Sequence, residues 1–404
     1  MPRNRTMRRT RRTLPGEVDS ARVKRSDRRA MRLASFNVEN MFRRPVALNA
    51  GSWSEGRPII EAYARLETLL EEEEYTPAIK REILRLVDRL GLTRSDESHW
   101  VVLRRSRGQL LRRRRAGEVE VVATGRGDWI GWLELKREAL DEEATRNTAR
   151  VIADVDADVL AVIEAEDRTA LVRFNRDVLP HGFTDGDAGW TYEHAMLIDG
   201  NDDRGIDVGL YSKGAFDIAT MRSHVDDRGP DHEPLFSRDC AEYEVTVPGG
   251  EPILLMVNHF KSKGYGRQVD NDARRRAQAT RVAAIYEARR AEGRARIAVM
   301  GDLNDTPDSA PLQPLLAGTD LRDVSEHPAF TADGRTGTFG TTSDKIDYIL
   351  LSPALFDRVT AAGVNRSGVW HGPRVRNPWP MLETLTRPQE AASDHAAIWC
   401  ELDV

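Results

Sequence analysis

The sequence predicts an α/β fold in which a mixed sheet, or a pair of packed sheets, is covered by outer helices. Several apolar segments have the length and composition of buried strands, and amphipathic helical segments lie between some of them. Strands and helices do not alternate strictly, which argues against a purely parallel sheet. The chain has 404 residues, of which 40% are hydrophobic, enough for one large domain with insertions or two medium ones.

Strands are predicted along most of the chain. The first is 31–42 (MRLASFNVENMF), and the next is 157–167, which is almost continuously apolar and therefore buried on both faces. The other predicted strands are 205–213, 240–247, 251–264, 296–305, 345–352 and 395–404. Helices are predicted at 141–155 and 271–293 from the spacing of their apolar residues.

Residues 45–138 are predicted to be an insertion into a domain that covers 31–404. The apolar spacing in 59–92 predicts two helices separated at Thr76 and Pro77, and two or three strands with Arg-rich turns follow. The segment between Arg104 and Arg115 contains seven arginines. These arginines either face a phosphate backbone or protect exposed hairpin edges against aggregation. The insertion is also a candidate surface for a protein partner.

Residues 1–30 are predicted to form a disordered basic tail. Residues 1–32 contain twelve Lys and Arg against three Asp and Glu, a net charge of +9 that leaves −14 for the rest of the chain. The tail is either an arm that contacts nucleic acid or the product of an overlong reading frame whose true start is Met31.

Composition argues against several classes of protein. No window approaches the roughly 18 uninterrupted apolar residues of a membrane span, and the N-terminus lacks the apolar region of a secretory signal. We therefore expect a cytoplasmic protein with no membrane partner. The two cysteines, Cys240 and Cys400, can form neither a disulfide framework nor a thiolate metal cluster. The sequence does not specify an oligomeric state.

Polar side chains recur where the predicted strands end. They are Asn37, Glu39, Glu164, His259, Asp302, Asn304, Asp347, Asp394 and His395. Each alone has an ordinary explanation, such as a turn or a helix cap. Glu164, however, directly follows the apolar segment VLAVI, where an unpaired carboxylate would be costly. So many polar strand ends in one chain favour a shared functional site.

The chemistry of these residues predicts a metal-dependent phosphodiesterase. Carboxylate and amide oxygens without thiolates suit a hard divalent cation, Mg²⁺ first, with Mn²⁺ and Ca²⁺ as alternatives. Hydrolysis of a phosphodiester requires an oriented water, a group that takes its proton, positive charge near the phosphate oxygens and assistance to the leaving alkoxide. An Asp, an Asn, two His and a metal ion can supply all four.

Six motifs carry a resemblance to a known family: SFNVEN, LAVIEAED, NHFKSKG, GDLND, KIDYILLS and SDH, in this order. Over 31–44 and 140–404 the chain resembles the endonuclease/exonuclease/phosphatase superfamily. The resemblance implies a DNase I-like fold, a four-layer α/β/β/α sandwich of two packed mixed sheets. The residues of the segments SFNVENMF, LFSR and NHFKSKG are most similar to those of a bacterial branch often described as extracellular deoxyribonucleases. This chain departs from that branch in its lack of a visible export signal and in the 45–138 insertion.

The resemblance implies a set of metal ligands. Glu164 matches the principal Mg²⁺ ligand, with Asn37 beside it and Asp394 completing the metal side. Glu39 is a weaker match to a second acidic ligand found in some members.

The resemblance also implies catalytic roles. Asp302 matches the residue that orients and deprotonates the attacking water, and Asn304 the residue that holds water and phosphate. His395 matches the histidine that contacts the scissile phosphate, and Asp347 the carboxylate that fixes its tautomer. His259 matches a second histidine, a candidate general acid. Apurinic-site endonucleases of the superfamily usually carry Tyr there, which argues against that subclass.

Four further predictions concern charged residues outside these motif positions. Asp207 is predicted to be the carboxylate partner of His259. Lys261 and Lys263 are interpreted as phosphate contacts, and the resemblance implies the same for Arg238. The arginines of 274–276 are expected to lie on the surface of an amphipathic helix.

Three functions compete on this evidence. The first is a Mg²⁺-dependent endonuclease or exonuclease, most consistent with DNA as the substrate. The second is a phosphatase or phosphodiesterase acting on a lipid, inositol phosphate or nucleotide, which the absence of the Pro-x-Trp-Cys-Asp-Arg type motif disfavours. The third is a non-catalytic binding module, which the retention of every acid, Asn and His makes a poor fit.

Overall fold

The computed structural model describes residues 30–39, 41, 43–47, 53–114, 118–139, 141–183, 189–202, 204–229, 232–264, 266–331, 334–373, 375 and 378–404. The prediction of a disordered tail falls on residues that, apart from Ala30, lie outside this range. Among the described residues, no helix is long and apolar enough to cross a membrane.

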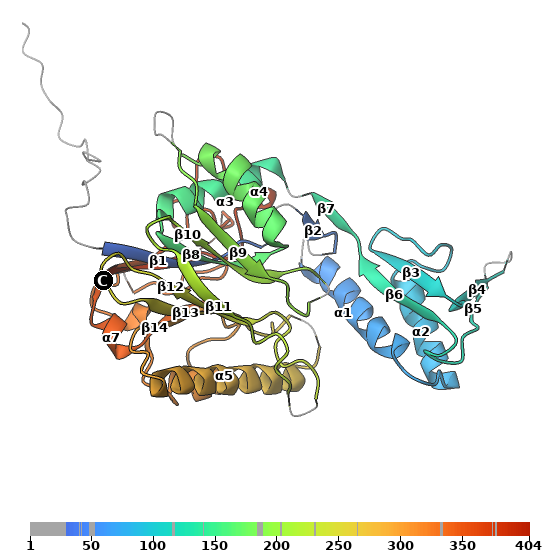
Figure 1. The fold of residues 1–404 in the computed structure, drawn as a ribbon. Coiled ribbons are helices and arrows are strands. Elements are labelled where there is room, and N and C mark those ends of the chain that lie inside the picture. Colours follow the sequence, from blue (N-terminus) through green and yellow to red (C-terminus); the bar gives the residue numbers. More distant parts are fainter. Residues whose placement is uncertain are drawn as a thin grey trace, which may run out of the picture.

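Two mixed six-stranded sheets form the centre of the structure (Figure 1). The first has the order β17-β18-β1-β8-β10-β9 and consists of β1 (Ala30–Asn37), β8 (Val159–Ala165), β9 (His194–Ile198), β10 (Asp207–Ser212), β17 (Val359–Asn365) and β18 (Ala397–Asp403). The second has the order β11-β12-β13-β14-β16-β15 and consists of β11 (Ile218–Arg222), β12 (Cys240–Val245), β13 (Ile253–His259), β14 (Ile297–Asp302), β15 (Arg322–Asp323) and β16 (Asp347–Leu351). The pairs β1–β8 and β13–β14 are parallel, and the other pairs in these sheets are antiparallel.

The two sheets pack face to face, and helices cover their outer faces. Leu33 of β1 and Leu255 of β13 belong to one buried apolar cluster between the sheets. The first sheet is covered by α3 (Glu142–Val155) and α4 (Arg168–Asp177), and the second by α5 (Gln268–Ala291) and α6 (Gln313–Leu316). The short helix α7 (Pro353–Phe356) follows β16. This arrangement confirms the predicted α/β/β/α sandwich.

The strands that the sequence did not predict lie mostly at the edges of the sheets. β9 and β17 are the two edge strands of the first sheet, and β11 is an edge strand of the second. β11 is largely exposed, and β17 (VTAAGVN) is rich in Ala and Gly, so neither shows the apolar pattern of a buried strand. Edge strands are exposed on one side and need less apolar sequence to be stable.

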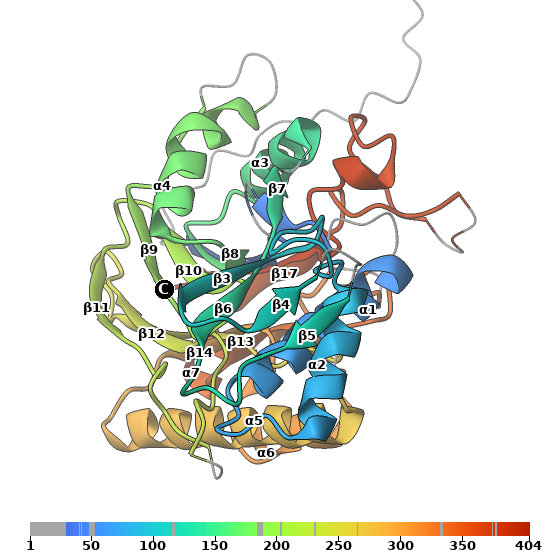
Figure 2. The same ribbon diagram turned by 90° about the vertical axis from the view of Figure 1, so that its right-hand side faces the viewer.

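Residues 53–135 form an inserted lobe with a hydrophobic core of its own. The lobe consists of α1 (Trp53–Leu70), α2 (Pro77–Arg89), β3 (Val101–Arg107), β4 (Leu111–Arg113), β5 (Val119–Val121) and β6 (Ile130–Leu135). Its core contains Leu66, Ile83 and the fully buried Trp129. It is joined to the sandwich through the antiparallel pair β2 (Arg43–Pro45) and β7 (Arg137–Ala139). Figure 2 shows the lobe in front of both sheets, so it stands at one end of the sandwich.

Candidate active site

The candidate active site lies where strands of both sheets end at a common edge. Asn37 is the last residue of β1, and Glu164 is the last but one of β8, the parallel neighbour of β1. In the second sheet, Asp302 at the end of β14 is in register with His259 of β13 and with Asp347 of β16. The side chains of Asn37 and Asp302 join the two sheets, because the Asn37 amide donates a hydrogen bond to Asp302 Oδ2 at 3.2 Å. The structure thus brings these predicted site residues together.

Asp302 is the buried centre of this group. Its Oδ1 accepts a hydrogen bond from the backbone N–H of Asn304 at 2.8 Å, and its Oδ2 accepts one from the Asn304 side-chain amide at 3.1 Å. Asn304 can turn back in this way because its φ of 54° lies in the left-handed region, which Asn tolerates better than most residues. The same amide also donates to the carbonyl of Phe260 at 3.2 Å. Asn304 therefore fixes the carboxylate and links the loops that follow β13 and β14.

His395 and Asp347 form a buried hydrogen-bonded pair. His395 Nδ1 lies 2.8 Å from Asp347 Oδ2, and His395 Nε2 lies 3.9 Å from Asp302 Oδ2. Although burial opposes the charged imidazole, Asp347 and then Asp394 hold the pKa of His395 well above its ordinary value. Thr338 Oγ1, which the sequence did not indicate, accepts the backbone N–H of Asp347 at 3.0 Å. The pairing orients Nε2 towards the centre of the site.

His259 approaches the same carboxylate from the other side. Its Nε2 lies 3.6 Å from Asp302 Oδ2 and 3.6 Å from Glu164 Oε1. Burial first, and then the positive charges of Arg238 and Arg204, lower the pKa of His259 well below its ordinary value. The pKa values of the two histidines are therefore shifted in opposite directions, by Asp347 and Asp394 at His395 and by burial and two arginines at His259.

The predicted pairing of His259 with Asp207 is wrong. His259 Nδ1 has no hydrogen-bond partner among the described residues. Asp207 instead accepts the backbone N–H of Gly200 at 2.7 Å, and burial raises the pKa of Asp207 to about 7. Asp202, five residues earlier, is the carboxylate of this loop whose charge opposes the fall in the pKa of His259. The bend between β9 and β10 determines which Asp of GNDDRGID approaches the histidine, and local sequence does not specify that bend.

The remaining predicted metal ligands lie around this centre. Asn37 Oδ1 accepts the backbone N–H of Glu39 at 3.0 Å, and Glu39 Oε2 accepts the backbone N–H of Asp394 at 3.2 Å. Glu39 thus ties the turn after β1 to the turn before β18. The side chains of Glu164 and Asp394 are partly exposed, so a hydrated ion can reach them.

The charge and the ligand atoms of the centre fit a divalent cation. Asp302, Asp347 and His395 offer ligand atoms that all lie within 4.8 Å of one another. Burial, and then repulsion from Asp347, raise the pKa of Asp302 to about 8. Among the described residues, no Lys or Arg forms an ion pair with either carboxylate. A cation bound by this group, or by the neighbouring carboxylate and amide oxygens, would supply the missing positive charge.

A buried basic network that the sequence indicated only in part lies next to His259. Arg238 is almost completely buried; its Nε lies 3.1 Å from Asp202 Oδ2, and its Nη1 donates to the carbonyl of Phe260 at 3.3 Å. Arg204 binds the same Asp202 carboxylate at 2.6 Å. Burial, and then Arg204 and Arg238, lower the pKa of Lys261 to about 7. Two arginines therefore share a single carboxylate here, and their charges act on the nearby Lys261.

The expectation that the arginines of 274–276 lie on the surface is wrong for Arg275, which is 0% exposed. Its Nε lies 3.0 Å from Asp305 Oδ2, and its Nη1 donates to the Lys261 carbonyl at 3.0 Å. Lys263, predicted to contact phosphate, also forms an ion pair with Asp305. The spacing of Arg275 from the buried Ala279, at i and i+4, was a signal that it lies on the inner face of α5.

Metal-binding oxygens, a fixed Asp and two histidines at the edge of an α/β/β/α sandwich define a metal-dependent phosphoesterase site. A model of the Endonuclease/Exonuclease/phosphatase family matches residues 130–395, more than half of the chain. The chain belongs to this family and is a metal-dependent phosphoesterase. No curated protein sequence matches it.

Several solved structures resemble the chain at low sequence identity. An endonuclease/exonuclease/phosphatase family protein from Bacteroides thetaiotaomicron is 17% identical, with a TM-score of 0.45 over 64% of this chain and 89% of that one. The mannosyl-6-phosphatase Bt3783 of Bacteroides thetaiotaomicron is 17% identical, with a TM-score of 0.44 over 64% of this chain and 91% of that one. Truncated Caenorhabditis elegans TDP2 is 17% identical, with a TM-score of 0.41 over 64% of this chain and 90% of that one. These identities are too low to transfer a substrate.

Proposed function

We propose that this protein is a nuclease that hydrolyses DNA phosphodiester bonds with the help of Mg²⁺. The observation that carries the proposal is the approach of two histidines to one buried carboxylate: His259 and His395 place Nε2 at 3.6 and 3.9 Å from Asp302 Oδ2. Attack on a diester requires a base for the water and assistance to an alkoxide leaving group. Two imidazoles on either side of the base can provide that assistance.

Each residue of the centre has a definite task in this reaction. Asp302 takes the proton of the attacking water, and Asn304 keeps its carboxylate in place. His395, held through Nδ1 by Asp347, directs Nε2 at the phosphate and adds positive charge there. His259 presents its own Nε2 from the opposite side and assists the leaving oxygen. Asn37, Glu164 and Asp394 are the oxygen ligands proposed to hold Mg²⁺, which when bound supplies positive charge to the phosphate oxygens.

The charge next to His259 supports a polyanionic substrate. Arg204 and Arg238 bring two guanidinium groups to this region, where both bind Asp202, and Lys261 lies two residues beyond His259. The body of the protein is acidic overall, so DNA must be held by local basic groups of this kind. The sequence similarity of three segments to the deoxyribonuclease-like bacterial branch agrees with this proposal.

The test is cleavage of supercoiled plasmid, linear duplex, single-stranded DNA and RNA with Mg²⁺, with Mn²⁺ and with EDTA. The wild type is compared with Asp302→Asn, which preserves shape and removes the base, and with Asp308→Asn as the matched control. Asp308 lies in the same loop, is exposed and contacts Thr306 only through a surface hydrogen bond. We expect metal-dependent cleavage of DNA that falls at least about 100-fold in Asp302→Asn and is unchanged in Asp308→Asn.

Two results would overturn the proposal. Folded, metal-loaded protein that cleaves no nucleic acid but hydrolyses a phosphate monoester or an inositol phosphate would establish the alternative function on the same fold. Full activity of Asp302→Asn would show that Asp302 is not the base.

A further inference from the structure

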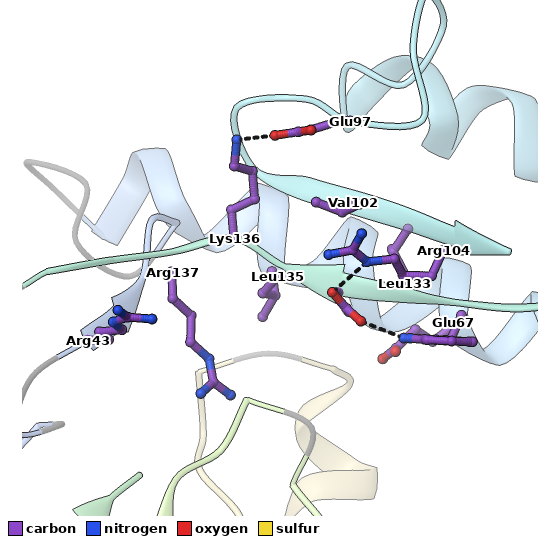
Figure 3. Close-up of a pocket in the computed structure, with 11 residues that line it drawn as sticks. Arg43, Glu67, Glu97, Val102, Arg104, Leu133, Leu135, Lys136 and Arg137 are labelled. Atoms are coloured by element: carbon purple, nitrogen blue, oxygen red, sulfur yellow. Dashed lines mark hydrogen bonds and ion pairs between the residues drawn. The ribbon is translucent and has the colours of Figure 1, made fainter. Parts of the chain in front are cut away.

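A groove that none of the proposed catalytic residues lines runs along the inserted lobe where it meets the sandwich (Figure 3). Its volume is about 710 Å³. The residues that line the groove include Arg43, Arg104, Trp132, Glu134 and Arg137. The inference drawn from it rests on the proposed function, because it concerns how the DNA substrate is held.

Trp132 gives the groove an exposed aromatic surface. It lies on the outer face of β6, opposite Arg104 of β3, and is 49% exposed. Its Nε1 donates to Glu134 Oε1 at 2.7 Å, and Arg104 Nε donates to Glu134 Oε2 at 2.9 Å. Glu134 therefore holds the indole and the guanidinium in fixed positions. A large apolar ring kept exposed in this way is available for stacking.

Two arginines at the lower end of the groove form no ion pair with a carboxylate of the described residues. In Figure 3, Arg137, the first residue of β7, extends towards the sandwich, and Arg43 lines the same part of the groove. Arg137 donates to a backbone carbonyl, that of Arg204, at 2.7 Å, and neither arginine forms an ion pair within the described part of the chain. At the opposite end, Lys136 is paired with Glu97 at 2.7 Å. The uncompensated positive charge is thus concentrated next to the sandwich.

The charge of the inserted lobe is divided between its two halves. Residues 101–135, which form its strands, contain eight Lys and Arg against four Asp and Glu. Residues 53–100, which form its helices, contain seven against eleven. A basic strand face on an acidic protein is complementary to a polyanion.

Hydrogen bonds connect the groove to segments that carry the candidate active site. Arg43 is six residues beyond Asn37 in the sequence. Its backbone N–H donates a hydrogen bond at 2.7 Å to Glu166, which is two residues beyond Glu164. Arg137 holds the loop that carries Arg204, whose partner Asp202 binds Arg238 beside His259. Arg43 and Arg137 are therefore the basic lining residues that connect the groove to the segments carrying the catalytic centre.

We propose that this groove binds a single-stranded segment of the DNA substrate next to the scissile phosphate. Arg43 and Arg137 contact its backbone phosphates, and Trp132 stacks on a base further along. This combination of an aromatic platform and basic side chains along a groove is how single strands are bound without sequence preference. A duplex would gain nothing from Trp132, because its bases are already stacked.

The test measures binding in EDTA, where no cleavage occurs, by fluorescence anisotropy of a labelled oligothymidylate of about 16 nucleotides. Trp132→Ala and Arg43→Ala are compared with Trp132→Phe, which keeps a stacking ring, and with Arg85→Ala as the matched control. Arg85 is an exposed arginine on the helical half of the lobe. We expect Trp132→Ala to weaken binding by between about fivefold and a hundredfold, Trp132→Phe much less and Arg85→Ala not at all. A matching oligouridylate and a duplex of the same length distinguish the other nucleic acids.

Cleavage gives the second readout. For Trp132→Ala we expect kcat/KM on the long single strand to fall about tenfold or more relative to kcat/KM on a dinucleotide. The inference would be overturned if wild type and Trp132→Ala bound the oligothymidylate equally and had the same ratio of kcat/KM on the long strand to kcat/KM on the dinucleotide. The groove would then bind a partner of another class. Failure of the proposed function is recognised separately, because wild type would then cleave no nucleic acid while the binding comparison still reports on the groove.

Discussion

Arg275→Met tests whether the buried guanidinium holds together the loops that carry the catalytic residues. The substitution keeps an unbranched, flexible side chain and removes the charge and the donors. In the wild type, Arg275 joins Asp305 of the GDLND segment, at 3.0 Å, to the backbone carbonyl of Lys261, at 3.0 Å. It also contacts Asp272, one turn earlier on α5.

The expected loss follows from what the substitution leaves behind. Asp305, with a side chain only 4% exposed, retains Lys263 as its charged partner, and the buried Lys261 carbonyl loses a donor. Breaking a buried ion pair by removing one partner costs about 3–5 kcal/mol. Because Lys263 remains and Asp272 is partly exposed, we expect the lower end, a loss of about 3 kcal/mol in the free energy of unfolding.

Urea denaturation followed by circular dichroism measures this loss. Arg276→Met is the matched control, because Arg276 is exposed and donates only to the Ala310 carbonyl; its effect should stay within about 0.5 kcal/mol. Adding Asp305→Asn to Arg275→Met should recover part of the loss, since a neutral amide needs no opposite charge. A loss below about 1 kcal/mol for Arg275→Met, or no recovery in the double variant, would refute the reasoning.

Three other predictions concern metal binding and pH. Mg²⁺ should raise the melting temperature of the wild type and raise it less in Glu164→Gln; an equal rise in both would exclude Glu164 as a ligand. Burial raises the pKa of Asp207 from 3.8 to about 7, so the folded state favours the protonated form and loses stability as pH rises through this interval. Asp207→Asn should remove that loss and melt higher than wild type above pH 7, and a parallel pH profile would contradict this. Burial opposes ionisation of Glu242, but the hydrogen bond from Arg289 lowers the pKa of Glu242 from 4.5 to about 2. The ionised Glu242 therefore stabilises the folded state above pH 4.5, and this contribution is lost as the pH falls towards 2. Glu242→Gln should lack this acid-side dependence of the melting temperature.

Local sequence was enough to predict an α/β fold with outer helices and to indicate most of the side chains that gather at the candidate site. Apolar runs such as 157–167 mark buried strands, and the polar residue that ends each run marks the edge where a functional group can emerge. Asp302 and His259 were found in this way, each at the end of its strand. The missed strands β9, β11 and β17 lie at sheet edges, where the apolar pattern is weak.

The motif resemblance implied a role for each residue of the site. Neither the local sequence pattern nor the resemblance could specify which charged side chains lie next to one another. The sequence analysis predicted Asp207 as the partner of His259, but in the folded loop Asp207 binds the backbone of Gly200 and the charge of Asp202 acts on the histidine. Arg275 looked like a surface residue among other arginines until α5 packed on the second sheet.

By itself the sequence indicated an α/β fold with outer helices, the polar side chains that gather at the candidate site and an inserted segment, because periodicity and strand ends are local properties. Only the tertiary structure decided that Asn37 bonds to Asp302 across 265 residues of chain, and that Arg137 of the insertion reaches the loop of Arg204. These contacts depend on how distant segments are packed against one another, and the geometry of that packing is set by the whole core and not by any short stretch of residues.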